Sequence, residues 1–235
     1  MKYYSVCLQI QGRPCLVVGG GKVAERKVRG LLASGGTVTV VSPGLTPGLL
    51  RLEAEGAITW ASRCYQPGEA EGFFLVMTAT DDPAVQDQVC ADGDRYNLLV
   101  NVADVPEKCN FILPALVRRG PVSIAISTSG KSPALAKKLR RELEAAVGTE
   151  YELVAELLGA LRPHVLQWGL PQADNEILFN RLVEGKLLTL VLERDWLKVQ
   201  HYLEKGLGRA LPSDVAEKLK KLVQAERPIV NEVGF

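Results

Sequence analysis

The chain has 235 residues, of which 47% are hydrophobic and 23% charged, and its formal net charge is +1. This composition is typical of a globular protein with a buried core, and the length suits one large domain or two small ones. The low net charge excludes a global attraction to nucleic acid or to a membrane surface, so any charged site must be local. We find no apolar run of about 18 residues and no signal-peptide pattern, and we expect no membrane span.

Five cysteines are scattered along the chain: Cys7, Cys15, Cys64, Cys90 and Cys109. Their number is odd and no two form a CxxC pair. This spacing favours reduced thiols over a disulfide framework or a metal site. We therefore expect mostly buried thiols in a cytoplasmic protein without a resident metal.

Strands and helices alternate through the first half of the chain. Apolar and β-branched runs predict buried strands at residues 15–20, 37–43, 57–62, 73–80 and 98–104. Helical patterns lie between them at 23–36, 49–56 and 82–97, the last capped by Asp81 or Asp82 before Pro83. Strands separated by helices indicate βαβ units, so the sequence predicts an α/β fold with a Rossmann-type parallel sheet.

The stretch VVGGGKVA (17–24) places Gly19, Gly21 and Ala24 in a G-x-G-x-x-A pattern between a predicted strand and a predicted helix. This context is the one that the dinucleotide-binding fingerprint requires. Gly19 would turn the chain, Gly21 would let the backbone approach a pyrophosphate, and Ala24 would let the helix pack on the strand. The free N–H groups of the helix start would attract phosphates. A tight turn that binds nothing is the alternative.

The second predicted strand lacks the acidic end that usually holds the adenosine ribose. Ser42 and Pro43 follow TVTVV instead, and a serine hydroxyl can bond a ribose without bringing a charge. No arginine stands beside Ser42 to select a 2′-phosphate. These residues favour NAD over NADP.

The stretch STSGKSP (127–133) resembles the end of a Walker phosphate loop, but Ala125 stands where that motif needs glycine. We therefore reject an ATPase. We expect a strand at 121–127 and a helix that begins at Ser132 or Pro133. Its expected buried stripe has i, i+4 spacing: Leu135, Leu139 and Leu143.

Basic residues gather in the same region, where no acidic residue lies between Cys109 and Arg141. They are Arg118, Arg119, Lys131, Lys137, Lys138, Arg140 and Arg141. One interpretation is a solvated helix face, since Glu142 and Glu144 follow. The other is a patch for an anionic small molecule, because the run lacks the aromatic residues that would stack on nucleic-acid bases.

The stretch LVNVADVPEKCNFILPA (99–115) places Asn101 and Asp104 at the end of a predicted strand. Open α/β sheets bind their ligands at the carboxyl edge of the strands. We expect the Asp104 carboxylate beside a cofactor, with capping of the turn at Val105–Pro106 as the alternative.

Four blocks in this order resemble the precorrin-2 dehydrogenase and sirohydrochlorin ferrochelatase family of siroheme synthesis. The blocks are VVGGGKVAERKVRGLLASGG (17–36), TATDD (78–82), NVADVPEKCNFILPA (101–115) and SIAISTSGKSPALAKKLRREL (123–143). The resemblance implies an NAD-binding Rossmann domain (1–113), a dimerisation segment (114–150) and a small helical C-terminal domain (151–235). It also implies a homodimer with its cleft between the subunits.

The activity that the resemblance implies is the NAD-dependent oxidation of precorrin-2 to sirohydrochlorin. Some members also insert Fe2+ in the same cleft. Asp104 matches the family's key aspartate, which acts as general base or orients the macrocycle. Val105 stands where relatives carry a second acid, which puts the iron insertion in doubt.

The implied contacts fall into two groups. The nucleotide group is Gly19, Gly20, Gly21, Lys22, Val23, Ala24, Ser42, Pro43, Thr80 and Asn101. The group for the anionic substrate is Arg118, Arg119, Ser127, Thr128, Lys131 and Lys137.

The last part of the chain reads as helical. Its first helix has an apolar stripe at helical spacing: Leu153, Leu157, Leu158 and Leu161. The region would be a packed bundle or a lid over a large tetrapyrrole. His164 and His201, the two histidines of the chain, read as ordinary surface or packing residues.

Two other functions stay open. One is a nucleotide-sensing regulatory domain, although such domains usually have an acidic end to the second strand and need no basic patch. The other is the dehydrogenation of a different anionic substrate.

Overall fold

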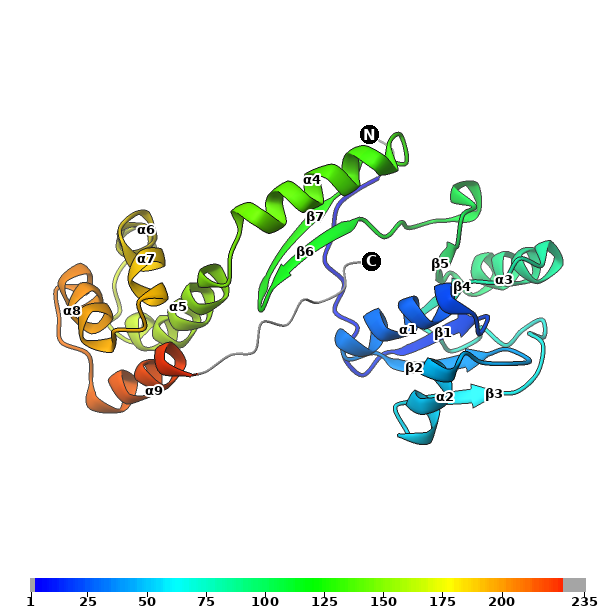
Figure 1. Cartoon of the computed structure of the whole chain (residues 1–235), viewed down its shortest axis with the longest axis horizontal. Helices are drawn as coiled ribbons and strands as arrows, with labels where there is room; N and C mark the ends of the chain where they lie inside the picture. Colours follow the sequence, from blue (N-terminus) through cyan, green and yellow to red (C-terminus); the bar gives the residue numbers. More distant parts are fainter. Residues whose placement is uncertain (1–2, 226–235) are drawn as a thin grey trace. The chain divides into compact units, whose positions relative to one another are not determined.

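The computed structural model describes residues 3–225 (Figure 1). Its contacts divide this part of the chain into two compact units, and we describe each by itself. The first unit holds residues 3–114 and 129–132, and the second holds 115–128 and 133–225. The further separation of 114–150 from the C-terminal region stays a prediction, and residues 226–235 of that region lie outside the described residues.

The first unit is built on a five-stranded parallel sheet with the strand order β3-β2-β1-β4-β5. Its strands are β1 (Pro14–Val18), β2 (Thr37–Val41), β3 (Ile58–Ala61), β4 (Leu75–Thr78) and β5 (Leu99–Val102). The order reverses between β1 and β4, which is the switch point of doubly wound sheets. The predicted Rossmann-type fold is confirmed.

Helices cover both faces of this sheet, so its strands are buried on both sides. They are α1 (Lys22–Ala33), α2 (Pro47–Ala54) and α3 (Pro83–Tyr96). Alternate residues of β1 point to opposite faces: Cys15 and Val17 belong to the cluster that includes residues of α1 and α2. Leu16 and Val18 belong to the cluster that includes Val89 of α3. Because both clusters are apolar, β1 reads as a continuous hydrophobic run.

Side-chain caps set where two of these helices begin. Asp82 caps α3, since its Oδ1 accepts a hydrogen bond from the Ala84 backbone N–H at 2.9 Å. Thr46 caps α2 by accepting from the Leu49 N–H at 3.2 Å. Each cap satisfies a backbone donor that the first helical turn leaves without a partner.

The second unit begins with a β-ribbon and a helix. The ribbon pairs β6 (Ala115–Arg119) with β7 (Val122–Ile126) in antiparallel register, and α4 (Pro133–Ala146) follows. The sequence does not predict β6, because its two arginines belong to a charged run and hide the pattern of a strand. The predicted buried stripe of α4 is wrong: no residue of α4 is buried, and Leu135 is 47% exposed.

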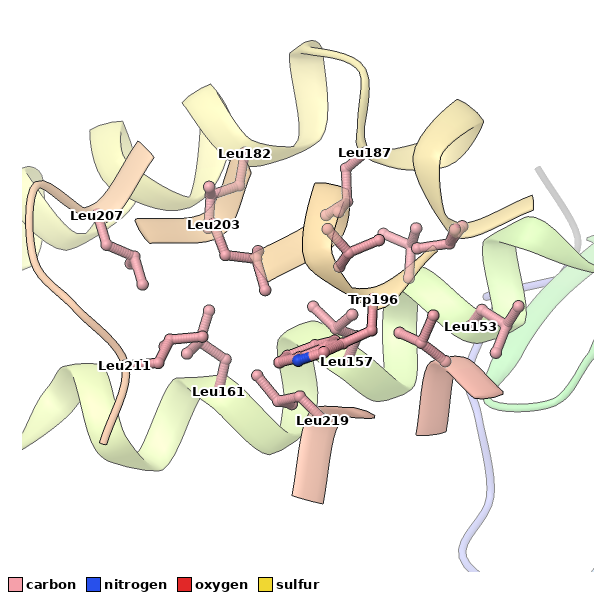
Figure 2. Packing of buried hydrophobic residues seen from close by; sticks show 14 of the residues in the cluster. Leu153, Leu157, Leu161, Leu182, Leu187, Trp196, Leu203, Leu207, Leu211 and Leu219 are labelled. Atoms are coloured by element: carbon pink, nitrogen blue, oxygen red, sulfur yellow. The ribbon is translucent and has the colours of Figure 1, made fainter. Parts of the chain in front are cut away.

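The rest of the second unit is helical, as predicted. Its helices are α5 (Glu150–Leu166), α6 (Gln172–Glu184), α7 (Leu187–Leu192), α8 (Trp196–Leu207) and α9 (Ser213–Gln224). Figure 2 shows how leucines from these helices meet around Trp196. Leu157 and Leu161 of the predicted stripe are almost fully buried in this cluster, and Leu158 packs against it. These helices therefore have a core of their own.

The cysteines are free thiols, but the expectation that most are buried is wrong. Cys15 is buried, and burial raises the pKa of its thiol to about 11, so it stays protonated at neutral pH. Cys7 and Cys64 are exposed, while Cys90 and Cys109 are half-buried. Among residues 3–225, no helix is long and apolar enough to cross a lipid bilayer.

Candidate active site

The glycine loop after β1 is packed so tightly that two of its residues must be glycine. Gly19 has φ +119°, and a Cβ on it would lie 2.3 Å from the carbonyl oxygen of Ala79. A Cβ on Gly20 would lie 1.9 Å from the carbonyl oxygen of Gly44. The loops after β2 and β4 therefore hold residues 19–20 between them, and a side chain at either position would push them apart.

Gly21 differs from these two, because the space in front of it is open. A Cβ there would meet no heavy atom within 4 Å. Gly21 is also the N-cap of α1 and supplies no side-chain cap, while Ala24 is fully buried against the sheet. The first N–H groups of α1 therefore face an accessible space with a partial positive charge, which suits a phosphate group.

Residues of the β2–α2 loop support the glycine loop from the side. The Thr46 N–H donates to the Gly20 carbonyl at 2.9 Å, and the Thr46 hydroxyl donates to Glu25 at 2.5 Å. The bond from the Thr46 hydroxyl, together with the Arg29 side chain, lowers the pKa of Glu25. Ser42 is buried, and its hydroxyl donates to the Gly44 carbonyl at 2.8 Å. Its proposed contact with a ribose stays a prediction.

Backbone hydrogen bonds continue beyond the strand ends and align the carboxyl edge of the sheet. The Gly19 N–H donates to Val41, and the Ala79 N–H donates to Val18. The Ala103 N–H then donates to Thr78 at 2.9 Å. The loops after β1, β4 and β5 therefore lie along one edge, which brings the glycine loop, Thr80 and Asp104 to the same side of the first unit.

Asp104 occupies an unusual backbone conformation at this edge. It is exposed and has φ +61°, a left-handed value that few residues other than glycine adopt. The short helix that follows, Pro106–Lys108, has Val105 as its N-cap and receives no side-chain cap bond. Within the described residues, a capping role for Asp104 is therefore not observed.

Asn101 is buried in β5, three residues before Asp104, and accepts a hydrogen bond from a residue that the sequence analysis did not single out. The Lys27 ammonium of α1 donates to Asn101 Oδ1 at 2.6 Å. The Asn101 amide nitrogen donates to the Phe111 carbonyl at 3.1 Å and lies 3.7 Å from the sulfur of Cys109. Lys27 lies six residues after Gly21, on the predicted helix. A charged residue on the buried face of that helix was the one sign in the sequence that it has a buried partner.

The predicted substrate-binding residues lie in two places. Lys131 belongs to the first unit and is exposed, whereas Lys137 is exposed on α4 of the second unit. Arg119 has a structural task in the second unit, since its guanidinium donates to the carbonyls of Val147, Glu144 and Arg118. Arg118, Ser127 and Thr128 also make interactions within the fold. Their roles toward a substrate stay predictions.

Two regions of the chain match family models. Residues 6–115 match a model described as putative NAD(P)-binding, and residues 119–146 match the central region of siroheme biosynthesis proteins. A siroheme synthase from Serratia proteamaculans is 35% identical over 207 residues, which cover 88% of this chain and 44% of that protein. The chain is similar to siroheme-biosynthesis proteins over both of these regions. The resemblance of its four sequence blocks is thereby confirmed.

Other comparisons agree with this similarity. A siroheme synthase from Methylococcus capsulatus is 36% identical over 193 residues, covering 82% of this chain and 41% of that protein. The chain thus spans less than half the length of these curated relatives. A solved structure of SirC, a precorrin-2 dehydrogenase, superposes with a TM-score of 0.73 at 28% identity, covering 87% of this chain and 98% of SirC. The family likeness therefore extends over both units.

Alanine at Gly20 and at Gly21 should have different effects, because only Gly20 is enclosed. Gly20→Ala forces the Gly44 loop aside and should destabilise the first unit by roughly 1–3 kcal/mol, the usual cost of overpacking. Gly21→Ala should leave the melting temperature unchanged but weaken NAD+ binding about tenfold, because its methyl group occupies the space for the phosphates. Thermal melts and calorimetric titration measure both. Undiminished NAD+ affinity in Gly21→Ala would remove the loop from the cofactor site.

Proposed function

We propose that this protein oxidises precorrin-2 to sirohydrochlorin with NAD+ as the electron acceptor. The observation that carries the proposal is the common edge of the parallel sheet. There the uncapped start of α1 and the carboxylate of Asp104 lie on the same side of one unit. A phosphate site and a carboxylate in reach of one cleft are what a nicotinamide-dependent dehydrogenation needs.

The residues of the chain divide the reaction between them. When bound, NAD+ would accept the hydride that leaves the tetrapyrrole. Residues 19–24 orient it through backbone N–H groups, and the missing acid after β2 favours NAD over NADP. Removing a hydride also requires the loss of a proton, and we assign that proton to Asp104 as general base. A carboxylate at an exposed turn can meet a large planar substrate from its edge.

The basic residues after β5 support a substrate that carries many carboxylates. Lys131 and Lys137 are exposed, and a lysine ammonium pairs with a carboxylate as a point charge. Because the net charge of the chain is only +1, such local groups are needed to attract a polyanion. We retain Arg118, Ser127 and Thr128 as further contacts and assign Arg119 to the fold instead.

We also propose a homodimer, supported by an apolar stripe that the second unit leaves uncovered. Leu135 is 47% exposed, and Leu139 and Leu143 are only half-buried. Burying these leucines against a second copy of the chain would remove apolar surface from water and so stabilise the pair. The free thiols of Cys7 and Cys64 on the surface suit a reducing compartment, and we propose the cytoplasm.

Asp104→Asn should separate binding from turnover. The variant keeps the shape of the side chain but loses the base, so oxidation of precorrin-2 should slow by at least about a hundredfold. NAD+ affinity should not change. The appearance of sirohydrochlorin absorbance measures the rate, and titration with NAD+ measures binding.

A wild-type protein that binds NAD+ without turnover would be a nucleotide sensor, and turnover of other anionic substrates alone would mean a different dehydrogenase.

Iron insertion is a separate proposal that the names of the curated relatives favour, since siroheme contains iron. Fe2+ would be a substrate here. Sirohydrochlorin and Fe2+ without NAD+ should give siroheme absorbance, and Asp104→Asn should slow this step as well, because the pyrrole protons also need an acceptor. If the wild-type chain oxidises precorrin-2 but inserts no iron, Val105 in place of an acid accounts for the loss.

A charge on the α4 stripe should dissociate the dimer. Leu135→Glu would bury an unpaired carboxylate in the interface, so the dissociation constant should rise by at least about tenfold. Leu197→Glu is the matched control, because Leu197 is 75% exposed on α8 of the same unit. Sedimentation equilibrium measures both variants. A wild-type monomer, or equal effects of the two substitutions, would contradict the proposed interface.

A further inference from the structure

Lys27 is a buried basic residue without a role in the proposed reaction. Lys27 is 6% exposed, whereas lysines are almost never buried without a partner. Burial lowers the pKa of its ammonium, and the neighbouring Arg26 acts in the same direction, while Cys109 and Asp104 raise it. A charge kept in such a place requires an explanation beyond the packing of α1.

The hydrogen bond of Lys27 decides how the Asn101 side chain is oriented. An ammonium group can only donate, so the oxygen of the carboxamide must face Lys27, 2.6 Å away. The amide nitrogen is then turned toward the Phe111 carbonyl and the sulfur of Cys109. With the carboxamide turned round, the NH2 group of Asn101 would face the Lys27 ammonium, and both can only donate. The Asn101 oxygen would then face the Phe111 carbonyl oxygen, and both can only accept.

Asn101 and Cys109 fix both ends of the loop that carries Asp104. The Cys109 sulfur accepts from the Val102 N–H at 3.2 Å, and its thiol lies 3.3 Å from the Val105 carbonyl. Between these anchors stands Asp104 with φ +61°. A strained backbone of this kind persists only where the surroundings hold it. The bond from Lys27 is therefore the first in a series that leads through Asn101 and Cys109 to the backbone on both sides of Asp104.

We propose that Lys27 is a positioning residue that keeps the Asp104 loop in its working geometry through Asn101. This inference rests on the proposed role of Asp104. Lys27 lies on the helix whose first turn forms the phosphate site, so one side chain ties the cofactor helix to the loop of the base. The bond is charge-assisted, and such bonds are stronger than those between neutral groups.

Lys27→Met in the full chain tests this role, since methionine fills similar space without a donor. The kcat for precorrin-2 oxidation should fall about tenfold to a hundredfold, as for the loss of a hydrogen bond to a charged group. The dissociation constant for NAD+ should stay within about twofold, because backbone N–H groups hold the phosphates. Arg26→Met is the matched control, an exposed neighbour of equal charge on α1, and its kcat should equal that of the wild type. Equal kcat in Lys27→Met and wild type would overturn the proposal.

The pH dependence distinguishes positioning from packing. Burial lowers the pKa of Lys27, so on the alkaline side its ammonium loses its proton at a lower pH than an exposed lysine would. The wild-type kcat should fall along this alkaline limb, and the limb should be absent in Lys27→Met. The same limb in Lys27→Met would show that another group causes it and would overturn the proposal.

Asn101→Ala supplies an independent variant. If Lys27 acts through Asn101, the double variant should be no slower than the slower single variant, whereas additive losses would overturn this route. Asp104→Asn tests the role of Asp104 separately from the role of Lys27. Full turnover in Asp104→Asn would refute the proposed base itself, whereas an inactive Asp104→Asn beside a normal Lys27→Met would refute only the role of Lys27.

Discussion

The close approach of three loops around Gly19 and Gly20 is the constraint on which the rest of the site depends. A Cβ at either glycine would lie far inside van der Waals contact with a carbonyl oxygen of the loop after β2 or β4. With both glycines in place, α1 can begin at the edge of the sheet with its N–H groups uncovered. The proposed phosphate site is therefore a result of backbone packing, and no charged side chain is needed to form it.

The same edge brings Asp104, the proposed base, to the side of the sheet on which α1 begins. Parallel strands end on one side, so the loop after β5 arrives next to the loops after β1 and β4. Its aspartate, Asp104, has a left-handed backbone, and the buried pair of Lys27 and Asn101 lies where β5 leads into this loop. A rigid support under an exposed base is the arrangement expected where geometry has to be held during turnover.

Local patterns were sufficient for most of the first unit. Each strand there is an apolar run between turn residues, and the pair Asp81–Asp82 before Pro83 located the start of α3, where the structure has Asp82 as the cap. Patterns were insufficient where the environment decides. β6 contains Arg118 and Arg119, and a charged strand of a two-stranded ribbon lacks the apolar alternation that identifies a half-buried strand. The stripe of α4 has helical spacing, but its spacing cannot tell whether this chain or a second copy covers it.

The sequence by itself determined the α/β fold of the first unit, the glycine fingerprint and the family, because each rests on residues close together in the chain. Tertiary structure alone decided which glycines are enclosed, that Arg119 serves the fold, and that Lys27 meets Asn101. Those two residues are 74 positions apart, and their contact exists only because α1 packs on the sheet that also contains β5. A buried charge and its partner are selected by the space around them, and that space forms only when the chain has folded.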